Sequence, residues 1–214
     1  MAKKLILIGA GKFARETVWM LERLNEGGCG EWELLGYVDD TPEKQGTSVY
    51  GLPVLGPVET LLTWPEEVWS LMPMGTCGGR RALAEKLSGA PNLHWATIRA
   101  KSAVTGKNFS AGEGCLLCEN TLCTVDVTLG RHTIVNVGST IAHDVVLGDF
   151  VTVSPGVTVC GNCEIGDGVF LGAGCTVIEQ IRIAPGVVVG AGATVVRDLT
   201  QPGTYVGTPA RRIR

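Results

Sequence analysis

Residues 145–198 read VVLGDF, VTVSPG, VTVCGN, CEIGDG, VFLGAG, CTVIEQ, IRIAPG, VVVGAG and ATVVRD, so this stretch repeats every six positions. The third position of each hexad is aliphatic throughout, from Leu147 to Val195. The fourth position is mostly glycine, alanine, serine or cysteine, as a tight corner needs. A hexapeptide period is typical of a parallel β-helix, whose stacked coils bury one continuous aliphatic core. The period reaches back to about Cys115, so we predict this fold for the second half.

The first hundred residues have a different character. All five tryptophans lie before residue 100, and glycine and valine dominate after it. We therefore place a boundary near Ala100 and expect two domains, residues 1–99 and 100–214.

The first domain alternates expected strands with expected helices, which indicates a small parallel α/β domain. We expect strands at residues 4–8, 34–38 and 68–74, a helix at 15–24, a helical turn at 58–62 and a further helix opening at Arg80.

A glycine loop lies between the first strand and the first helix. Residues 9–14, GAGKFA, fit the G-x-G-x-x-A dinucleotide fingerprint, and Asp39 and Asp40 end the next strand. Fewer than 100 residues provide one mononucleotide half, so we expect binding of a nucleotide or phosphate end by helix N-terminal amides. The alternative is a turn that only lets helix and strand pack closely. Two interpretations of Asp39 and Asp40 are open: they accept hydrogen bonds from a ribose or a base, or they form a solvated turn.

Composition excludes several classes. The net charge is −3 and no long basic run occurs, which argues against nucleic-acid binding. No apolar stretch approaches the roughly 18 residues that span a bilayer. Lys3 and Lys4 precede an apolar segment too short for a signal peptide, so we expect a cytoplasmic protein.

The eight cysteines include two CxxC pairs, at 115–118 and 160–163. Cys115 and Cys163 share a hexad position eight hexads apart, roughly 12 Å at strand spacing, which is too far for one zinc ion. We therefore expect no metal and interpret Cys123, Cys163 and Cys175 as small apolar fillers.

With three hexads per coil, equivalent residues of successive coils stack in columns, and one corner is lined by small residues over four coils. Its columns are Gly138, Gly156, Gly174 and Gly192; Val137, Pro155, Ala173 and Ala191; and Asn136, Ser154, Gly172 and Gly190. Two interpretations are open. Either the turns favour small residues for steric reasons alone, or the corner forms a smooth groove in which an extended ligand lies against backbone amides.

The three histidines differ in setting. His94 lies in a strand-like segment and is expected to pack, whereas His132 is expected to be a solvated corner residue. His143 precedes Asp144, and its stack neighbour Gly161 has no side chain to cover it. An imidazole beside a carboxylate at an open corner fits a general base, and an ordinary surface histidine is the alternative. Two helix histidines are too few for a three-histidine zinc site.

Taken together, these residues resemble the NeuD/PglD-type sugar acyltransferases, which comprise sialic acid O-acetyltransferases and nucleotide-amino-sugar N-acetyltransferases of the hexapeptide-repeat superfamily. The resemblance covers the whole chain. It is carried by GAGKFARE at 9–16, the strand ending in Asp39-Asp40, the turn at 74–80, the segment 139–150 with its His-Asp pair, and VGTPA at 206–210. It implies a Rossmann-like first domain and a left-handed parallel β-helix.

The resemblance also implies site residues. His143 is the implied general base, Asp144 raises its basicity, and a backbone amide near Gly161 stabilises the oxyanion. Acetyl-CoA as co-substrate would lie between neighbouring subunits of a homotrimer, with contacts at Thr152, Ala173 and Ala191. The nucleotide-sugar contacts are implied at Gly11, Lys12, Phe13, Asp39, Asp40 and Gly75.

The chain departs from many members at two places, with Thr152 where they carry histidine and Lys12-Phe13-Ala14 where they carry Gly-His-Gly or Gly-Phe-Gly. We expect acetyl transfer from acetyl-CoA to an amine or hydroxyl of a sugar by direct attack. A non-catalytic trimeric sugar-nucleotide binder or scaffold is the alternative, which the two departures favour.

Overall fold

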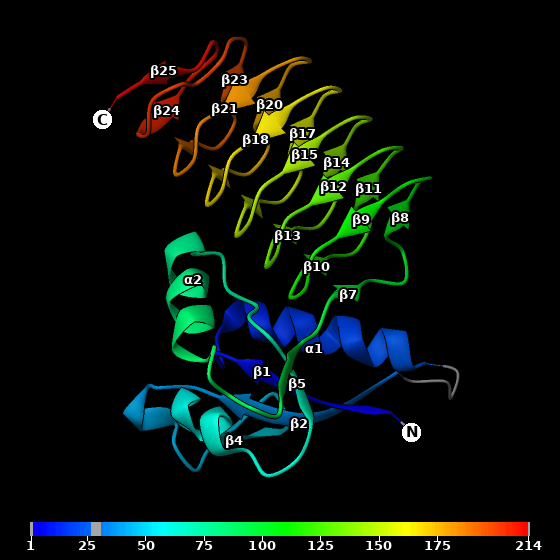
Figure 1. Cartoon of the computed structure of the whole chain (residues 1–214), viewed down its shortest axis with the longest axis vertical. Coiled ribbons are helices and arrows are strands. Elements are labelled where there is room, and N and C mark those ends of the chain that lie inside the picture. Colours follow the sequence, from blue (N-terminus) through cyan, green and yellow to red (C-terminus); the bar gives the residue numbers. More distant parts are fainter. Residues whose placement is uncertain (1, 27–30, 214) are drawn as a thin grey trace. The chain divides into compact units, whose positions relative to one another are not determined.

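The computed structural model describes residues 2–26 and 31–213 (Figure 1). The chain divides into two compact units, Met1–Met74 with Gly79–Thr97 and Gly75–Gly78 with Ile98–Arg214. The short segment Gly75–Gly78 therefore groups with the second unit although it lies far earlier in the sequence. Within the described residues, no helix has the length and apolarity to cross a membrane.

The first unit is built on a six-stranded sheet of order β3-β4-β2-β1-β5-β6. All neighbouring strands are parallel except β3 and β4. The strands are β1 (Lys3–Ile8), β2 (Trp32–Val38), β3 (Ser48–Val49), β4 (Leu52–Gly56), β5 (Val68–Leu71) and β6 (Leu93–Trp95). The expected parallel α/β arrangement is confirmed, with the third expected strand ending at Leu71 rather than Met74.

Two α-helices and two 3-10 turns complete this unit's elements, α1 (Lys12–Asn25), α2 (Cys77–Lys86), η1 (Pro42–Lys44) and η2 (Val58–Thr63). Both α-helices begin three residues earlier than expected, because their first turns contain residues that the apolar periodicity does not mark. The core is aliphatic and includes Ile6, Ile8, Val38 and Leu61. Arg80 is buried as well, and its guanidinium donates a 2.6 Å hydrogen bond to the Met74 carbonyl.

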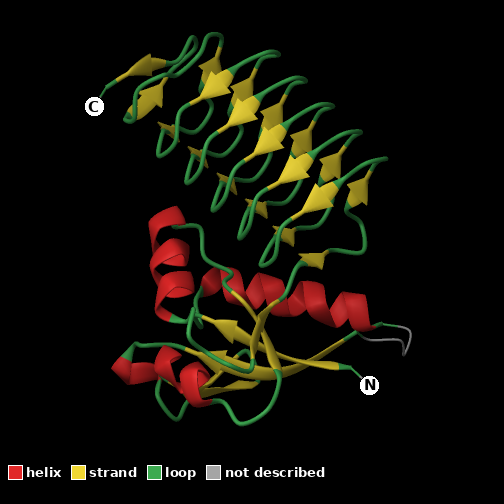
Figure 2. Cartoon of the chain, in the orientation of Figure 1, coloured by secondary structure: helices red, strands yellow, loops and turns green. Residues whose placement is uncertain are grey.

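The second unit is a β-helix of short parallel strands (Figure 2). From β7 to β20, every strand pairs in register with the third strand after it, as in the series Thr140, Thr158, Thr176 and Thr194, so three hexads make one coil. The third-position side chains point inward and are at most 3% exposed from Leu147 to Val195. The predicted fold class, a Rossmann-like domain followed by a left-handed parallel β-helix, is confirmed.

The coils form three sheets. The first sheet contains β7 (Ile98–Arg99), β10 (Leu116–Leu117), β13 (Ile134–Val135), β16 (Thr152–Val153), β19 (Phe170–Leu171), β22 (Val188–Val189), β24 (Thr204–Val206) and the antiparallel β25 (Arg211–Arg212). The second contains β8 (Val104–Thr105), β11 (Leu122–Cys123), β14 (Thr140–Ile141), β17 (Thr158–Val159), β20 (Thr176–Val177) and β23 (Thr194–Val195). The third contains β9 (Ser110–Ala111), β12 (Thr128–Leu129), β15 (Val146–Leu147), β18 (Glu164–Ile165) and β21 (Arg182–Ile183).

The expectation that His132 is a solvated corner residue is wrong. Its side chain is 2% exposed and stacks on Phe150, with ring centroids 5.0 Å apart. On the other side it lies against Gly114, where a Cβ would come within 2.2 Å of the ring. Gly114, His132 and Phe150 occupy the same position in successive coils, so the coils on either side bury the imidazole. His94 is half exposed and stacks on Trp69 at 4.9 Å.

The interior cysteines behave as apolar residues. Cys123, Cys163 and Cys175 are fully buried and unpaired, and burial raises the pKa of Cys123 and Cys175 to about 12. A thiol that resists ionisation is a poor metal ligand. Across residues 2–26 and 31–213, no three histidine, cysteine or acidic side chains converge in a way that would hold a metal ion.

Candidate active site

His143 and Asp144 form a side-chain pair at an exposed corner of the β-helix, directly after β14. The His143 Nδ1 atom lies 2.8 Å from Asp144 Oδ2, and both side chains are about half exposed. Asp144 occupies the left-handed backbone region with φ of 58°, which turns its carboxylate back towards the ring. A carboxylate only accepts hydrogen bonds, so it keeps the proton on Nδ1 and leaves Nε2 as an acceptor.

Gly161 lies one coil further on, against the imidazole. A Cβ at this position would come within 2.5 Å of His143 Cε1 and 2.6 Å of Nε2, so any larger residue would displace the ring. Gly161 is a fifth-position residue, and proline occupies the same position at 155 and 185. Proline has no N–H, so the hydrogen bonds between successive coils do not require a fifth-position N–H. Among the described residues, the Gly161 N–H donates no hydrogen bond.

Other fifth-position amides show which partners this backbone geometry accepts. The Arg131 N–H donates 2.7 Å to Asp149 Oδ1, and the Asp149 N–H donates 2.8 Å to Asp167 Oδ1. Fifth-position amides of this β-helix thus hydrogen-bond to anionic oxygens beside the corner. The Gly161 amide belongs to the same class, next to the imidazole.

The small-residue corner is open to solvent. Ala173 and Ala191 are exposed, and a Cβ built on Gly156, Gly174 or Gly192 meets nothing within 4 Å. Sixth-position residues adopt positive φ at every corner, yet the His143 corner uses Asp126, Asp144, Asn162 and Gln180 there. Glycine is therefore not required by the turn, and its use in this corner leaves the surface there without side chains. The fourth-position Gly172 and Gly190 are different, because their Cβ atoms would strike the next coil at 2.6 and 2.8 Å.

Thr152 and Gly75, two residues singled out from the sequence for different ligands, lie together. Thr152 is 3% exposed and its Oγ1 donates a 3.0 Å hydrogen bond to the Gly75 carbonyl. The Cys77 thiol donates in turn to Thr152 Oγ1 at 3.3 Å. Sequence reasoning missed Cys77, since no periodic pattern links it to a residue 75 positions away.

The glycine loop of the first unit is held by Asp39. Its Oδ2 accepts the Ala10 N–H at 2.7 Å and the Lys44 ammonium at 2.7 Å, and its Oδ1 accepts the Thr41 N–H at 2.9 Å. Although burial acts against the charged form, these donors hold the pKa of Asp39 well below its usual range. Three strong donors therefore already engage the Asp39 carboxylate.

The remaining first-unit candidates surround the start of α1 and the end of β2. Gly11 is the N-cap of α1 with an extended backbone and no capping side chain, and Gly11 and Lys12 are exposed. Phe13 is half-buried. Asp40 is half exposed, and its Oδ1 accepts the Val58 N–H at 2.8 Å, which ties the start of η2 to the end of β2.

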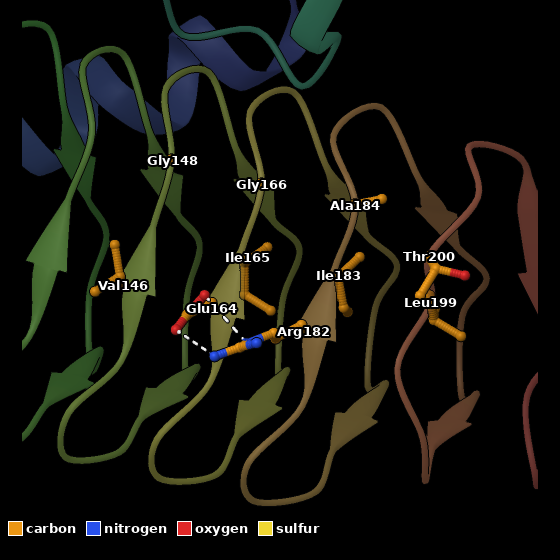
Figure 3. Close-up of a pocket in the computed structure, with 10 residues that line it drawn as sticks. All are labelled: Val146, Gly148, Glu164, Ile165, Gly166, Arg182, Ile183, Ala184, Leu199 and Thr200. Carbon is orange, nitrogen blue, oxygen red and sulfur yellow. Dashed lines mark hydrogen bonds and ion pairs between the residues drawn. The ribbon is translucent and has the colours of Figure 1, made fainter.

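A separate pocket of about 530 Å³ lies on the third sheet of the β-helix (Figure 3). Val146 lies at one end and Leu199 and Thr200 at the other, and Arg182 Nε pairs with Glu164 Oε2 at 3.3 Å between them. A second, polar hollow of about 480 Å³ shares Val146, Glu164 and Arg182 and reaches Asp144. Asp144 of the His143–Asp144 pair therefore lines this polar hollow, and both side chains of the pair are about half exposed.

Two family models match the chain. The PglD N-terminal domain matches residues 4–87, and the bacterial transferase hexapeptide (six repeats) matches residues 162–197. The first match contains the segments 9–16, 39–40 and 74–80 that carry the resemblance, and the second lies within the hexapeptide repeat. The chain is similar to NeuD/PglD-type sugar acetyltransferases in both of its parts.

Solved NeuD/PglD-type structures are similar over the full length. The acetyltransferase domain of PglB from Neisseria gonorrhoeae FA1090 is 28% identical with a TM-score of 0.87, covering 99% of this chain and 100% of that one. A histidine-to-asparagine variant of perosamine N-acetyltransferase from Caulobacter crescentus, in complex with CoA and GDP-perosamine, is 26% identical with a TM-score of 0.89, covering 100% and 98%. WeeI from Acinetobacter baumannii AYE is 26% identical with a TM-score of 0.87, covering 99% and 100%. The comparison with curated protein sequences gives no match.

Proposed function

We propose that this protein transfers an acetyl group from acetyl-CoA to an amine, or a hydroxyl, of a nucleotide-linked sugar. The observation that carries the proposal is the His143–Asp144 pair, with Nδ1 and Oδ2 2.8 Å apart and Gly161 against the ring. Further support comes from the similar structures, since one holds CoA with GDP-perosamine and a PglB structure holds acetyl coenzyme A.

In this proposal His143 is the general base. The acceptor nitrogen attacks the thioester carbonyl carbon, and Nε2 takes the proton that the nitrogen loses. Asp144 keeps the other proton on Nδ1 and stabilises the imidazolium that forms. The carbon–sulfur bond then breaks, and the imidazolium returns the proton to the CoA thiolate. No cysteine or serine of the described residues hydrogen-bonds to the His143 ring, which favours direct attack over an acyl-enzyme.

We assign the oxyanion of the tetrahedral intermediate to the Gly161 N–H. This amide lies beside the imidazole and takes part in no hydrogen bond among the described residues. Loss of one such donor typically costs 10²–10³-fold in kcat.

We assign the acetyl-CoA chain to the small-residue corner at Ala173 and Ala191. That corner precedes each strand of the second sheet, whereas His143 follows β14 of the same sheet. About five or six residues of extended chain separate the two corners, roughly 15–20 Å. A thioester lying in one corner cannot reach a base at the other, so the proposed site combines corners from two copies of a homotrimer.

The nucleotide end of the acceptor is assigned to the first unit, at Gly11, Lys12, Phe13 and Asp40, with Gly75 towards the sugar. The uncapped start of α1 presents N–H groups that suit a phosphate. Asp39 contributes through the loop that it holds, because its carboxylate already accepts three donors.

The test is thiol release from acetyl-CoA with a panel of nucleotide amino sugars, with GDP-perosamine included. We expect turnover of at least one member, and His143→Ala to lower kcat by about 10²–10⁴-fold with little change in acetyl-CoA affinity. Asp144→Asn should lose less, because the imidazole remains. His94→Ala, which removes another partly exposed histidine, is the matched control and should keep parental kcat. If His143→Ala stays within threefold of the parent, the base lies elsewhere.

A further inference from the structure

Between Ile98 and Val188, Thr152 is the one polar residue of a column of the β-helix, and the next polar member is Thr204 after Val188. The column consists of paired second-position residues of successive strands of the first sheet: Ile98, Leu116, Ile134, Thr152, Phe170 and Val188. Leu116 and Ile134 are buried to the same degree as Thr152, at 0 to 3% exposure. Packing at this position therefore accepts an aliphatic side chain, and the hydroxyl needs another explanation.

The hydrogen bonds of the hydroxyl provide that explanation. Oγ1 donates its one proton to the Gly75 carbonyl at 3.0 Å and accepts from the Cys77 thiol at 3.3 Å. A hydroxyl has a single proton, so Thr152 retains none for a second acceptor. A side chain that stabilises a thioester carbonyl must donate a hydrogen bond to its oxygen. The hydrogen bonds of Thr152 therefore do not fit the acyl-group contact that the family resemblance implies for this residue.

Two other features restrain the partner segment: the Cys77 thiol lies 3.7 Å from the Val169 carbonyl oxygen, and Cys77 and Gly78 begin helix α2. A Cβ built on Gly75 or on Gly78 meets nothing within 4 Å, so side-chain packing does not fix the backbone at either glycine. Gly75 precedes helix α2 and, as a glycine outside a regular element, has wide conformational freedom. The Thr152 hydroxyl, with Cys77 beside it, ties this backbone to strand β16.

We propose that Thr152 is a positioning residue for the acceptor, acting through the Gly75 carbonyl, and that it makes no contact with the thioester. The inference rests on the proposed function, in which Gly75 lies towards the sugar. Fixing the Gly75–Gly78 backbone sets where the acceptor lies and leaves acetyl-CoA binding to the small-residue corner.

The test compares Thr152→Val, which keeps shape and removes the hydroxyl, with Thr152→Ser, which keeps the hydroxyl. On the panel member that the parent turns over fastest, Thr152→Val should raise the acceptor KM about three- to tenfold, as expected for one lost hydrogen bond. The KM for acetyl-CoA should stay within twofold, and Thr152→Ser should restore the acceptor KM. Cys77→Ala leaves the Thr152 proton on Gly75 and should change the acceptor KM less than Thr152→Val does.

Two kinetic outcomes would overturn the proposal. A rise in the acetyl-CoA KM, or a fall in kcat, with the acceptor KM unchanged would place Thr152 at the thioester. Parental kinetics in Thr152→Val would leave the hydroxyl without a role. Thermal unfolding of each variant checks the fold, and the aliphatic neighbours in the column lead us to expect small shifts.

Amide hydrogen exchange provides a readout that does not need turnover. Residues 75–80 should exchange faster in Thr152→Val than in Thr152→Ser or the parent, because the hydrogen bond that holds the segment is gone. Equal exchange in all three proteins would refute the tether even if the parent acetylates no panel member. Failure of the proposed function and failure of this inference are thus separate results.

Discussion

Asp39 illustrates how one buried side chain organises the glycine-loop end of the first unit. Its carboxylate joins the glycine loop at Ala10, the chain after β2 at Thr41, and Lys44 of η1. Because the charged form accepts these hydrogen bonds, the pKa of Asp39 lies below its unfolded value. A carboxyl group with a depressed pKa stabilises the fold above its unfolded pKa of about 3.9, and this contribution is lost as pH falls below that value.

We predict that Asp39→Asn destabilises the protein by about 1–3 kcal/mol at pH 7. All three partners are donors, and an amide group directs its own N–H₂ at one of them. Urea unfolding measures the difference, which should narrow as pH falls from 5 towards 2. Asp40→Asn is the control and should cost less, because Asp40 is half exposed and accepts one backbone N–H. A pH-independent gap between parent and Asp39→Asn would contradict the charge-based account.

Single residues mark the limit of prediction from this sequence. The His143–Asp144 pairing follows from adjacency and from Gly161 stacked one coil further on, and the structure places Nδ1 and Oδ2 2.8 Å apart. The burial of His132 was also encoded, since Gly114 and Phe150 occupy its column, but the hexad position alone indicated a corner. The Thr152–Gly75 and Asp39–Ala10 hydrogen bonds join distant segments that no period relates, so only the folded chain reveals them.

At the scale of elements, the hexad period was sufficient to predict the β-helix because the strands from β7 to β23 repeat with the same spacing. Pairing between strands three hexads apart and an inward third position follow directly from the aliphatic column. The first unit lacks such a constraint, and its helix starts were misplaced by three residues. Helix α2 begins with Cys77-Gly78-Gly79, which intrinsic propensity assigns to a loop. Tertiary context overrides that preference here.

The small-residue corner yields a prediction that separates a ligand channel from turn sterics. Ala173→Trp or Ala191→Trp should lower acetyl-CoA affinity at least tenfold, about 1.4 kcal/mol, because the ring would occupy the open corner. Both alanines are exposed, so stability should change little. Pro185→Trp, an exposed fifth-position residue of another corner, is the matched control. If calorimetry shows unchanged acetyl-CoA binding in both alanine variants, the small residues of this corner serve only the turn and do not bind acetyl-CoA.

At the scale of the whole molecule, the second sheet of the β-helix offers a flat face for self-association. Its outward column begins with the exposed Val104 and Leu122 and continues with half-buried threonines at 140, 158, 176 and 194. The His143 corner and the small-residue corner border this face on opposite edges. Copies that pair through the face would bring the base of one towards the channel of the next. We expect light scattering at micromolar concentration to give about three times the chain mass, and a monomer would contradict a shared site.

Subunit mixing tests the shared site directly. His143→Ala subunits lack the base but keep the channel, and Ala173→Trp subunits keep the base but block the channel. In a closed trimer with three equivalent interfaces, a mixed trimer of either composition pairs an intact base with an intact channel at about one third of its sites. Co-expressed, differently tagged subunits purified through both tags should therefore recover about one third of parental thiol release at acetyl-CoA concentrations well below the KM of Ala173→Trp, where each variant alone has little activity. A site confined to one chain predicts no recovery at any ratio, because every chain would carry one of the two lesions.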